Sequence, residues 1–212
     1  MEKPTSELTN EYIKEHPDIK SCLKKDLINY SSLARLIAKE LKIEKKTSKE
    51  AILIAARRFQ DKLKAEISYE KEIKNLLADS DLDIKNKIVV YIIEKNINFE
   101  YFDNIEKLIK KDFGVFYLLE GSGHYTIITQ EKYAKALDAK FVNRIIAKHE
   151  NAAMITLKSP KEIEYIRGVT SYLTSLFTEN GINIIEIFSF WTDTLFIINK
   201  EDVNKVINFL KF

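Results

Sequence analysis

Few of the side chains that could carry out chemistry stand at spacings that support it. The three histidines, His16, His124 and His149, fall in separate segments, and none has a metal-ligand spacing such as H-E-x-x-H. The single cysteine, Cys22, lies in an apolar helical stripe, which favours a packed thiol over a nucleophile. The chain has no P-loop, no G-x-G-x-x-G and no G-x-S-x-G. We therefore expect no enzyme activity, no catalytic residue, no metal and no cofactor.

One short string resembles a nucleophile beside a base. Gly121-Ser122-Gly123-His124 stands between two runs rich in β-forming residues, and glycines supply the positive φ angles that hairpin turns need. The matching position of a later repeat reads Trp191-Thr192-Asp193. We interpret the string as a turn, and we expect His124 to begin the next strand.

A second candidate is Gly168, where the pattern changes from strand to helix. Backbone N–H groups at a helix N-terminus have no helical partner and lie at the positive end of the helix dipole. Both properties suit a carboxylate, which every α-amino acid carries. The alternative is that Gly168, like Gly181 at the other end of the same helix, only marks a turn.

Two stretches of the chain nearly repeat one another. Residues 126–137 read TIITQEKYAKAL, and residues 196–207 read FIINKEDVNKVI. The identical pairs are Ile127 with Ile197, Ile128 with Ile198, Glu131 with Glu201, and Lys135 with Lys205. In both copies a β-rich run becomes a helical pattern, and the flanks extend each copy to β-α-β-β-α. The repeat predicts two duplicated α/β modules that share one core.

The modules are expected over residues 80–150 and 151–212, after a helical domain over residues 1–79. A strand over 141–148 would complete the first module as β-α-β-β-α-β, the ferredoxin-like pattern. The second copy reaches Phe212 directly after its last helix. Its closing strand is either missing or supplied by another segment, such as residues 82–84.

The second copy resembles an ACT domain, and most closely the ACT modules at the regulatory end of aspartate kinases. The resemblance rests on Gly168-Val169, on the turn ENGINI at 179–184, and on FIINKED at 196–202. It covers residues 153–212 well and residues 87–148 only in topology. The first copy has Asp112-Phe113-Gly114 in place of the N-G-I-N turn and no glycine before its first helix, so we expect that module to be degenerate.

The resemblance implies that an amino acid or similar small effector binds at interfaces between paired domains. The helix-start loop would meet the effector carboxylate, and two asparagines after the helix would contact its amino group or side chain. The expected ligand-binding residues are Arg167, Gly168, Val169, Asn180, Gly181 and Asn183.

The N-terminal part is helical by period, with helices expected over 7–15, 18–25 and 32–41, and from Lys49 toward residue 77. Helix caps are expected within residues 29–31 and at Thr47 or Ser48. Residues 27–35 and 50–58 resemble small archaeal helix-turn-helix modules. That resemblance implies DNA as a possible partner, with these contacts: Lys45, Lys46, Lys49, Arg57 and Arg58.

The distribution of charge gives mild support to DNA binding. Residues 1–65 hold 15 Lys and Arg against 10 Asp and Glu, whereas residues 66–212 hold 19 against 22. Such an excess could neutralise several phosphates. The alternative is a solvated helical face on a dimerisation or spacer domain.

The expected fold class is α+β, with an N-terminal all-α, helix-turn-helix-like domain followed by two ferredoxin-like βαββαβ modules in a shared antiparallel sheet. Residues 88–93 are apolar at every position, which predicts strands covered on both faces and a homodimer. No apolar window approaches the length of a membrane span, and the start of the chain lacks the apolar core of a signal peptide. We expect a cytoplasmic protein with no membrane partner, and a single cysteine suits a reducing compartment.

Two functions follow from these expectations. The first is a non-catalytic regulatory protein that binds a small-molecule effector, an amino acid above all, and signals through its helical domain. The alternative is a DNA-binding transcription regulator, with or without a ligand. A purely structural or protein-interaction module forms a third class.

Overall fold

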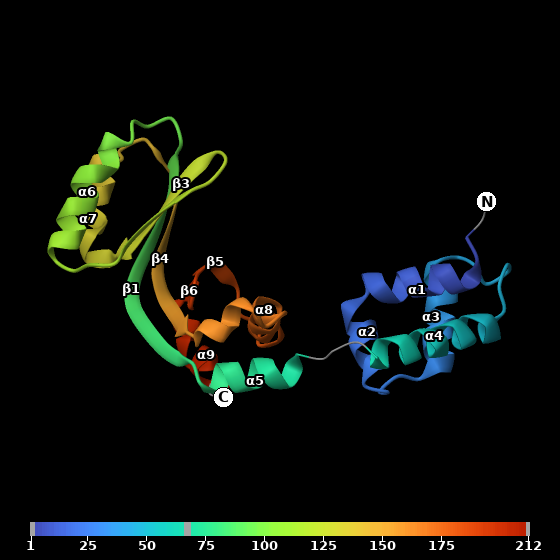
Figure 1. Cartoon of the computed structure of the whole chain (residues 1–212). Helices are drawn as coiled ribbons and strands as arrows, with labels where there is room; N and C mark the ends of the chain where they lie inside the picture. The colour runs from blue at the N-terminus through green and yellow to red at the C-terminus, as the bar shows by residue number, and fades with distance from the viewer. Residues whose placement is uncertain (1–2, 66–68, 211–212) are drawn as a thin grey trace. The chain divides into compact units, whose positions relative to one another are not determined.

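The computed structural model describes residues 3–65 and 69–210 and divides the chain into two compact units, Met1–Ser68 and Tyr69–Phe212 (Figure 1). The first unit contains the helices α1 (Thr5–Glu15), α2 (Pro17–Lys24), α3 (Tyr30–Glu40) and α4 (Lys49–Lys64). Their apolar faces enclose one core, whose fully buried members include Ile13, Leu23, Ile37, Ile52 and Leu63.

Local sequence signals set the ends of these helices. Asn29 Oδ1 accepts a hydrogen bond from the Ser32 N–H at 3.0 Å, and Ser48 Oγ accepts one from the Ala51 N–H at 3.1 Å. Both caps were predicted, and both satisfy N–H groups that have no partner inside the helix. Pro17 begins α2, where its missing N–H has no cost.

The helix predicted from Lys49 toward residue 77 is too long. Helix α4 ends at Lys64, and a separate helix, α5 (Glu70–Ala78), follows it. Helix α5 belongs to the second unit, because Ile73, Leu76 and Leu77 are buried in that unit's core. The prediction failed because a run without glycine or proline carries no local signal of a break.

The second unit contains one six-stranded sheet with the order β2-β3-β1-β4-β6-β5, in which every pair of neighbours is antiparallel. The strands are β1 (Asp81–Glu94), β2 (Phe116–Glu120), β3 (His124–Gln130), β4 (Ile145–Lys158), β5 (Ile184–Phe190) and β6 (Asp193–Asn199). The helices are α6 (Glu100–Lys111), α7 (Ala134–Lys140), α8 (Val169–Glu179) and α9 (Val203–Phe209). Short 3-10 turns are η1 (Glu131–Tyr133), η2 (Lys161–Glu164) and η3 (Lys200–Asp202). An α+β fold with an antiparallel sheet agrees with the prediction.

The two modules share their longest strands, β1 and β4, which run side by side as curved ribbons (Figure 1). The second half of β1 pairs with β3, from Ile88 opposite Gln130 to Glu94 opposite His124. The first half pairs only with β4, where Leu82 lies opposite Leu157. Residues 81–85 therefore supply the closing strand of the second module, which confirms one of the two alternatives. The predicted module boundary at 150 falls inside the continuous strand β4.

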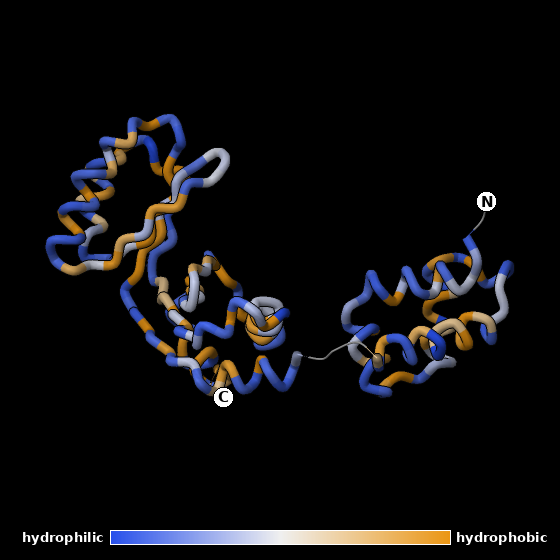
Figure 2. Tube along the Cα trace, in the orientation of Figure 1, coloured by the Kyte–Doolittle hydropathy of each residue, from blue (hydrophilic) through white to orange (hydrophobic). Residues whose placement is uncertain are grey.

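Both faces of each half of the sheet are covered, one by helices and the other by the opposite half of the sheet. In β1, Val89, Tyr91 and Ile93 face α6 and α7. Ile88 and Val90 face the other way, into a cluster with residues of β4 and β6. This arrangement explains why β1 is apolar without alternation, and Figure 2 shows the apolar stretch along the strand.

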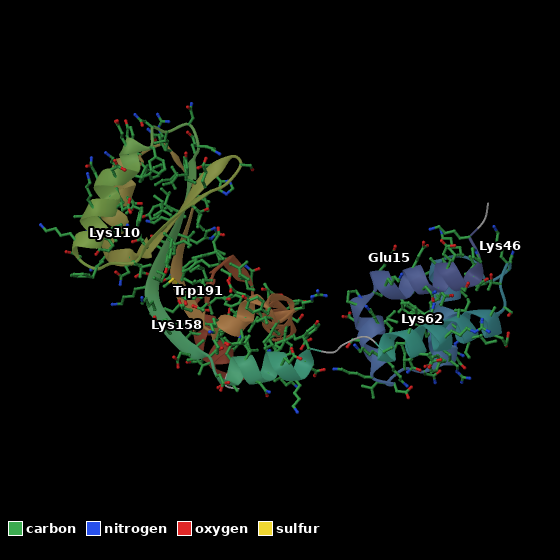
Figure 3. All side chains as sticks on the ribbon, in the orientation of Figure 1. Glu15, Lys46, Lys62, Lys110, Lys158 and Trp191 are labelled. Atoms are coloured by element: carbon green, nitrogen blue, oxygen red, sulfur yellow. The ribbon has the colours of Figure 1, made fainter. Side chains whose placement is uncertain are left out.

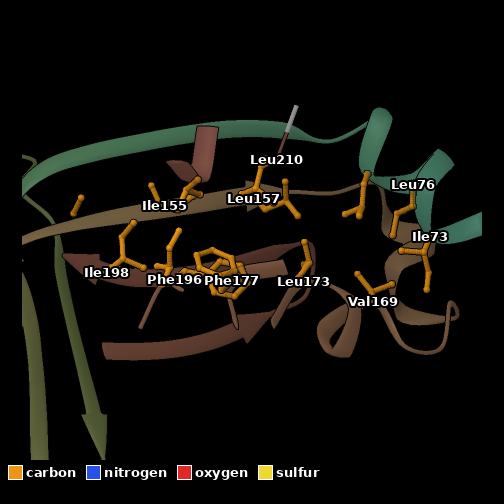
Figure 4. Close-up of a cluster of buried hydrophobic side chains, with 14 residues drawn as sticks. Ile73, Leu76, Ile155, Leu157, Val169, Leu173, Phe177, Phe196, Ile198 and Leu210 are labelled. Atoms are coloured by element: carbon orange, nitrogen blue, oxygen red, sulfur yellow. The ribbon is translucent and has the colours of Figure 1, made fainter. Parts of the chain in front are cut away.

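Helices α5, α8 and α9 cover the second module on its other face. Ile155 of β4 and Phe196 of β6 are fully buried beneath α8, and Phe177 of α8 stacks on Phe196 with ring centroids 4.5 Å apart (Figure 4). None of the helices within residues 3–65 and 69–210 combines the length and apolar character needed to cross a membrane.

Candidate functional site

Gly168 begins α8 in a conformation that suits glycine. Its φ of 90° lies in the left-handed region, and no side chain caps the helix that follows. The Tyr172 N–H donates to the Gly168 carbonyl at 2.9 Å, which is the first hydrogen bond of the helix. The N–H groups of the first turn before Tyr172 therefore have no helical acceptor, as the sequence predicted.

A pocket of about 270 Å³ opens at this helix start. It lies between the η2 segment, the first turn of α8 and the β5–β6 hairpin. The lining residues are Ile163, Glu164, Ile166, Gly168, Val169, Thr170, Ser171, Ser189, Trp191 and Thr194. The volume is slightly below the usual range for drug-sized ligands and suits a smaller molecule.

The pocket combines an acid, hydroxyls and apolar surface. Glu164 is the one acidic residue of the pocket lining, and the start of α8 contributes N–H donors, so the lining contains a group of each kind that a zwitterion needs. Ser189 Oγ lies 3.3 Å from Thr194 Oγ1, which ties the hairpin strands together at the pocket wall. Trp191, labelled in Figure 3, is 70% exposed, so its indole ring is free to cover a ligand.

The structure brings together only part of the predicted ligand-binding set. Gly168 and Val169 line the pocket, and Arg167 is exposed directly beside them. Asn180, Gly181 and Asn183 lie at the far end of α8.

The eleven residues of α8 place the two ends of the helix about 16 Å apart. One small ligand cannot contact both groups, so the two asparagines were wrongly assigned to the same site. The Asn180 side chain instead donates to the Leu176 carbonyl at 2.8 Å. Gly181, with φ 67°, ends the helix.

Three residues that line the pocket were not among the predicted ligand-binding residues: Glu164, Ser189 and Trp191. Glu164 and Ser189 come from η2 and β5, and no local pattern connects those segments with α8. Only Trp191 could have been suspected from the sequence, because it is the one tryptophan of the chain and stands at a predicted hairpin turn. Its φ of 49° is a further strained feature of that turn.

The corresponding helix of the first module is less suited to an anion. Asn98 Oδ1 accepts the Glu100 N–H at 3.2 Å, so one donor at the start of α6 is already used. Glu100 and Asp103 also place two carboxylates in the first turn. These charges would repel a ligand carboxylate; the degeneracy of the first module stays a prediction.

The predicted DNA-binding residues do not form one surface. Lys45 and Lys46 lie in the loop before α4, and Lys49 is its first residue. The Arg57 guanidinium lies over the Tyr30 ring at 5.2 Å from its centroid. Arg58 lines a pocket between α1 and α4. Because Arg58 follows Lys49 by about two and a half helical turns, the two side chains leave opposite sides of α4.

The segment 121–123 joins β2 to β3, and the Gly121 N–H donates to the His124 carbonyl at 2.8 Å. A turn was therefore predicted correctly, and His124 begins β3, but neither Gly121 nor Gly123 has the positive φ that was expected of it. Cys22 was predicted to be packed, but it is exposed. Only Leu23 of α2 is buried, so the neighbouring position points outward. Within residues 3–65 and 69–210, no group of three or more His, Cys, Asp or Glu is placed to hold a metal ion.

No protein-family model matches the chain, and no curated protein matches it in sequence. Solved structures match in fold. An aspartate kinase from Clostridium acetobutylicum has a TM-score of 0.51 and 14% identity, covering 61% of this chain and 33% of the enzyme. A Vibrio cholerae protein of unknown function, described as a possible transport protein, has a TM-score of 0.50 and 15% identity, covering 68% of this chain and 96% of that protein.

The regulatory subunit of aspartate kinase from Thermus thermophilus matches at a TM-score of 0.49 and 9% identity, covering 61% of this chain and 92% of the subunit. At these identities the likeness concerns the fold alone. This chain spans about a third of the Clostridium enzyme, and its structural neighbours include an aspartate kinase, as the sequence resemblance predicted.

Proposed function

We propose that this chain is a non-catalytic regulatory protein that binds an amino acid or a similar zwitterion at the start of α8. The observation that carries the proposal is the pocket of about 270 Å³ at the uncapped start of α8, whose lining includes Gly168 and Glu164. The Clostridium aspartate kinase, an allosteric enzyme, shares the fold, and this supports a regulatory role.

The proposed binding mode follows from the pocket wall. The ligand carboxylate accepts from the N–H groups of Thr170 and Ser171, and its ammonium group pairs with Glu164. Ile166 and Trp191 offer apolar surface to the ligand side chain. Backbone groups recognise what all amino acids share, so side-chain specificity rests on the apolar wall.

A thermal-shift panel with the twenty amino acids tests the proposal. A ligand present at a hundred times its Kd stabilises the folded state by about 2.7 kcal/mol, which raises Tm by a few degrees. Glu164→Gln removes the partner of the ammonium group and should weaken binding at least tenfold. Glu179→Gln, at the far end of α8, is the matched control and should leave affinity unchanged.

Gly168→Ala and Gly181→Ala form a second matched pair. Both glycines have positive φ, so each alanine should destabilise the fold by roughly 1 kcal/mol. Only Gly168→Ala should also weaken effector binding, because only Gly168 lines the pocket. If no amino acid raises Tm, or if the Glu164 and Glu179 variants bind an amino acid equally well, the effector site is not at the start of α8.

The alternative function is DNA binding by the first unit, and the positive excess over residues 1–65 favours it. Lys49 and Arg57 leave α4 on neighbouring sides and are the strongest contacts of the predicted set. A mobility shift with duplex DNA should then depend steeply on salt, and Lys49→Gln with Arg57→Gln should reduce the slope by about two. Absence of any shift at low salt would exclude this function and leave effector sensing alone.

We also propose a homodimer, because the exposed edge of the sheet carries apolar side chains. Ile187 and Phe190 of β5 are 40% and 46% exposed, next to Trp191. Light scattering at micromolar concentration should give twice the mass of the chain. A monomeric mass would contradict the proposal.

A further inference from the structure

A pocket of about 290 Å³ lies within the first unit, in the angle between α1 and α4. Ser6 and Asn10 of α1 form one wall, and Arg58 and Lys62 of α4 form the other. The small side chains of Ala51 and Ala55 leave the space between the two helices open. None of these residues belongs to the effector pocket, which lies in the other unit.

The basic wall of this pocket has no acidic partner. Arg58 and Lys62 stand one helical turn apart, so both project on the same side of α4. Among the residues that the structure describes, neither side chain forms an ion pair or a hydrogen bond. Glu11 of α1, which follows Asn10 in the sequence, is already paired with Lys3 at 2.6 Å. Lys62, labelled in Figure 3, therefore carries a charge that the unit itself does not neutralise.

The opposite wall holds a polar atom that lacks a donor. Asn10 Oδ1 is buried and accepts no hydrogen bond from the described part of the chain. Such an acceptor costs about 1–3 kcal/mol unless something supplies a hydrogen. Asn10 lines the pocket, but its Oδ1 has almost no exposed surface, so the side chain must turn toward the pocket before a bound molecule can supply this hydrogen.

We propose that this pocket binds a phosphate-bearing anion. The Arg58 guanidinium donates to two phosphate oxygens, and the Lys62 ammonium group balances the remaining charge. Asn10 Oδ1 accepts a hydrogen bond from a hydroxyl of the same ligand, either on the phosphate or on the carbon chain that carries it. The anion could be a small phosphate ester or a phosphate of a nucleic-acid backbone, since both present the same oxygens to Arg58 and Lys62.

Isothermal titration of the full-length chain with glucose 6-phosphate, inorganic phosphate and duplex DNA tests the proposal. The variant Arg58→Gln with Lys62→Gln should lose at least tenfold in phosphate affinity. The matched control is Lys39→Gln with Lys42→Gln, which removes the same charge from exposed positions of the same unit, outside the pocket and outside the predicted DNA contacts. All four side chains are on the outside of the unit, so both variants should fold, and circular dichroism checks this.

The outcomes separate the pocket from a general effect of charge. Affinity lost in the Arg58 and Lys62 variant but kept in the control supports the pocket. Equal losses in both variants overturn it, and so does the absence of saturable binding to any of the three probes. If binding is found, DNA that competes with glucose 6-phosphate identifies the backbone as the phosphate source, and lack of competition identifies a small ester. Asn10→Ala should weaken the ester more than inorganic phosphate if the ester hydroxyl meets Oδ1.

Discussion

The ring of Tyr117 in β2 contacts the ring of Phe188 in β5, with centroids 5.2 Å apart at an interplanar angle of 62°. These strands are the two edges of the sheet, at opposite ends of its strand order. Their contact shows that the sheet curls until its edges approach each other. The helix-free faces of both modules therefore cover one another and enclose the cluster around Val90, Met154 and Ile197.

The contact between Tyr117 and Phe188 should contribute measurably to the free energy of unfolding of the second unit. Phe188→Ala should destabilise the chain by about 1–3 kcal/mol, and a double-mutant cycle with Tyr117→Ala should give a coupling energy of about 0.5–1.5 kcal/mol. Urea unfolding monitored by circular dichroism measures both values. The same cycle with Phe190, whose centroid lies 6.1 Å from Tyr117 and which is 46% exposed, should give a smaller coupling. Equal couplings would mean that the edges do not meet as described.

The second module should not fold without residues 81–85. A fragment of residues 145–212 holds β4, β5 and β6 but lacks the strand that pairs with Leu157 and Ile155. It should show no cooperative unfolding transition, because one edge of its sheet and part of its core are missing. A fragment of residues 69–212 keeps both modules and α5, and should unfold cooperatively. Cooperative unfolding of the shorter fragment would show that the modules are independent.

Gly114 should be required for close packing and not for its backbone conformation. A Cβ added there would lie 2.6 Å from Tyr133 Oη and 2.9 Å from Ile109 Cγ2. We expect Gly114→Ala to lower the free energy of unfolding by about 1–3 kcal/mol, because the core must shift to accommodate the methyl group. Gly123→Ala is the matched control, since a Cβ there meets no atom within 4 Å. Its effect should stay within about 0.5 kcal/mol.

A polar network between the buried Tyr91 and the partly exposed Asp138 and Lys148 should make the stability of the second unit depend on pH. Tyr91 is fully buried, and its hydroxyl donates to Asp138 Oδ1 at 2.8 Å. Lys148 donates to the other oxygen of Asp138 at 3.0 Å. Burial first, and the hydrogen bond to Asp138 second, raise the pKa of Tyr91 to about 12. Hydrogen bonding to Glu150, and then to Asp138, raises the pKa of Lys148.

Both shifts favour the protonated forms of Tyr91 and Lys148 in the folded state. Their contribution to stability is therefore complete below about pH 10, the unfolded pKa of tyrosine, and is lost as pH rises through the folded values. The pKa of Asp138 is lowered by the hydrogen bonds from Tyr91 and Lys148, although partial burial opposes this, so its contribution is lost in acid. Stability should fall on both sides of the neutral range.

Tyr91→Phe tests the alkaline part of this profile. At pH 7 the variant should lose about 1–3 kcal/mol, because Asp138 and the Ala134 carbonyl lose a donor. Between pH 10 and about 12 its stability should fall less steeply than that of the parent chain. Tyr165→Phe, at a position that is 79% exposed, should reproduce the parent profile. If stability falls with pH in the same way in the parent chain and in both variants, Tyr91 does not cause the alkaline loss of stability.

The sequence alone determined the features that depend on near neighbours along the chain. The repeat of residues 126–137 in 196–207 predicted two modules with the same order of elements, because strand and helix periods are local. The caps at Asn29 and Ser48, the turn at 121–123 and the uncapped start of α8 were also predicted. Each of these needs only a few adjacent residues, so a local pattern is sufficient to identify it.

The tertiary structure decided which distant segments meet. The pairing of Leu82 with Leu157, the sharing of β1 and β4, and the packing of α5 in the second core have no local signature. Strand pairing joins backbone groups that every residue carries, so the choice of partner depends on the whole core. For the same reason the sequence did not predict that Glu164 and Trp191 line the pocket at the start of α8. Asn180 and Asn183, which were expected there, follow the other end of that helix.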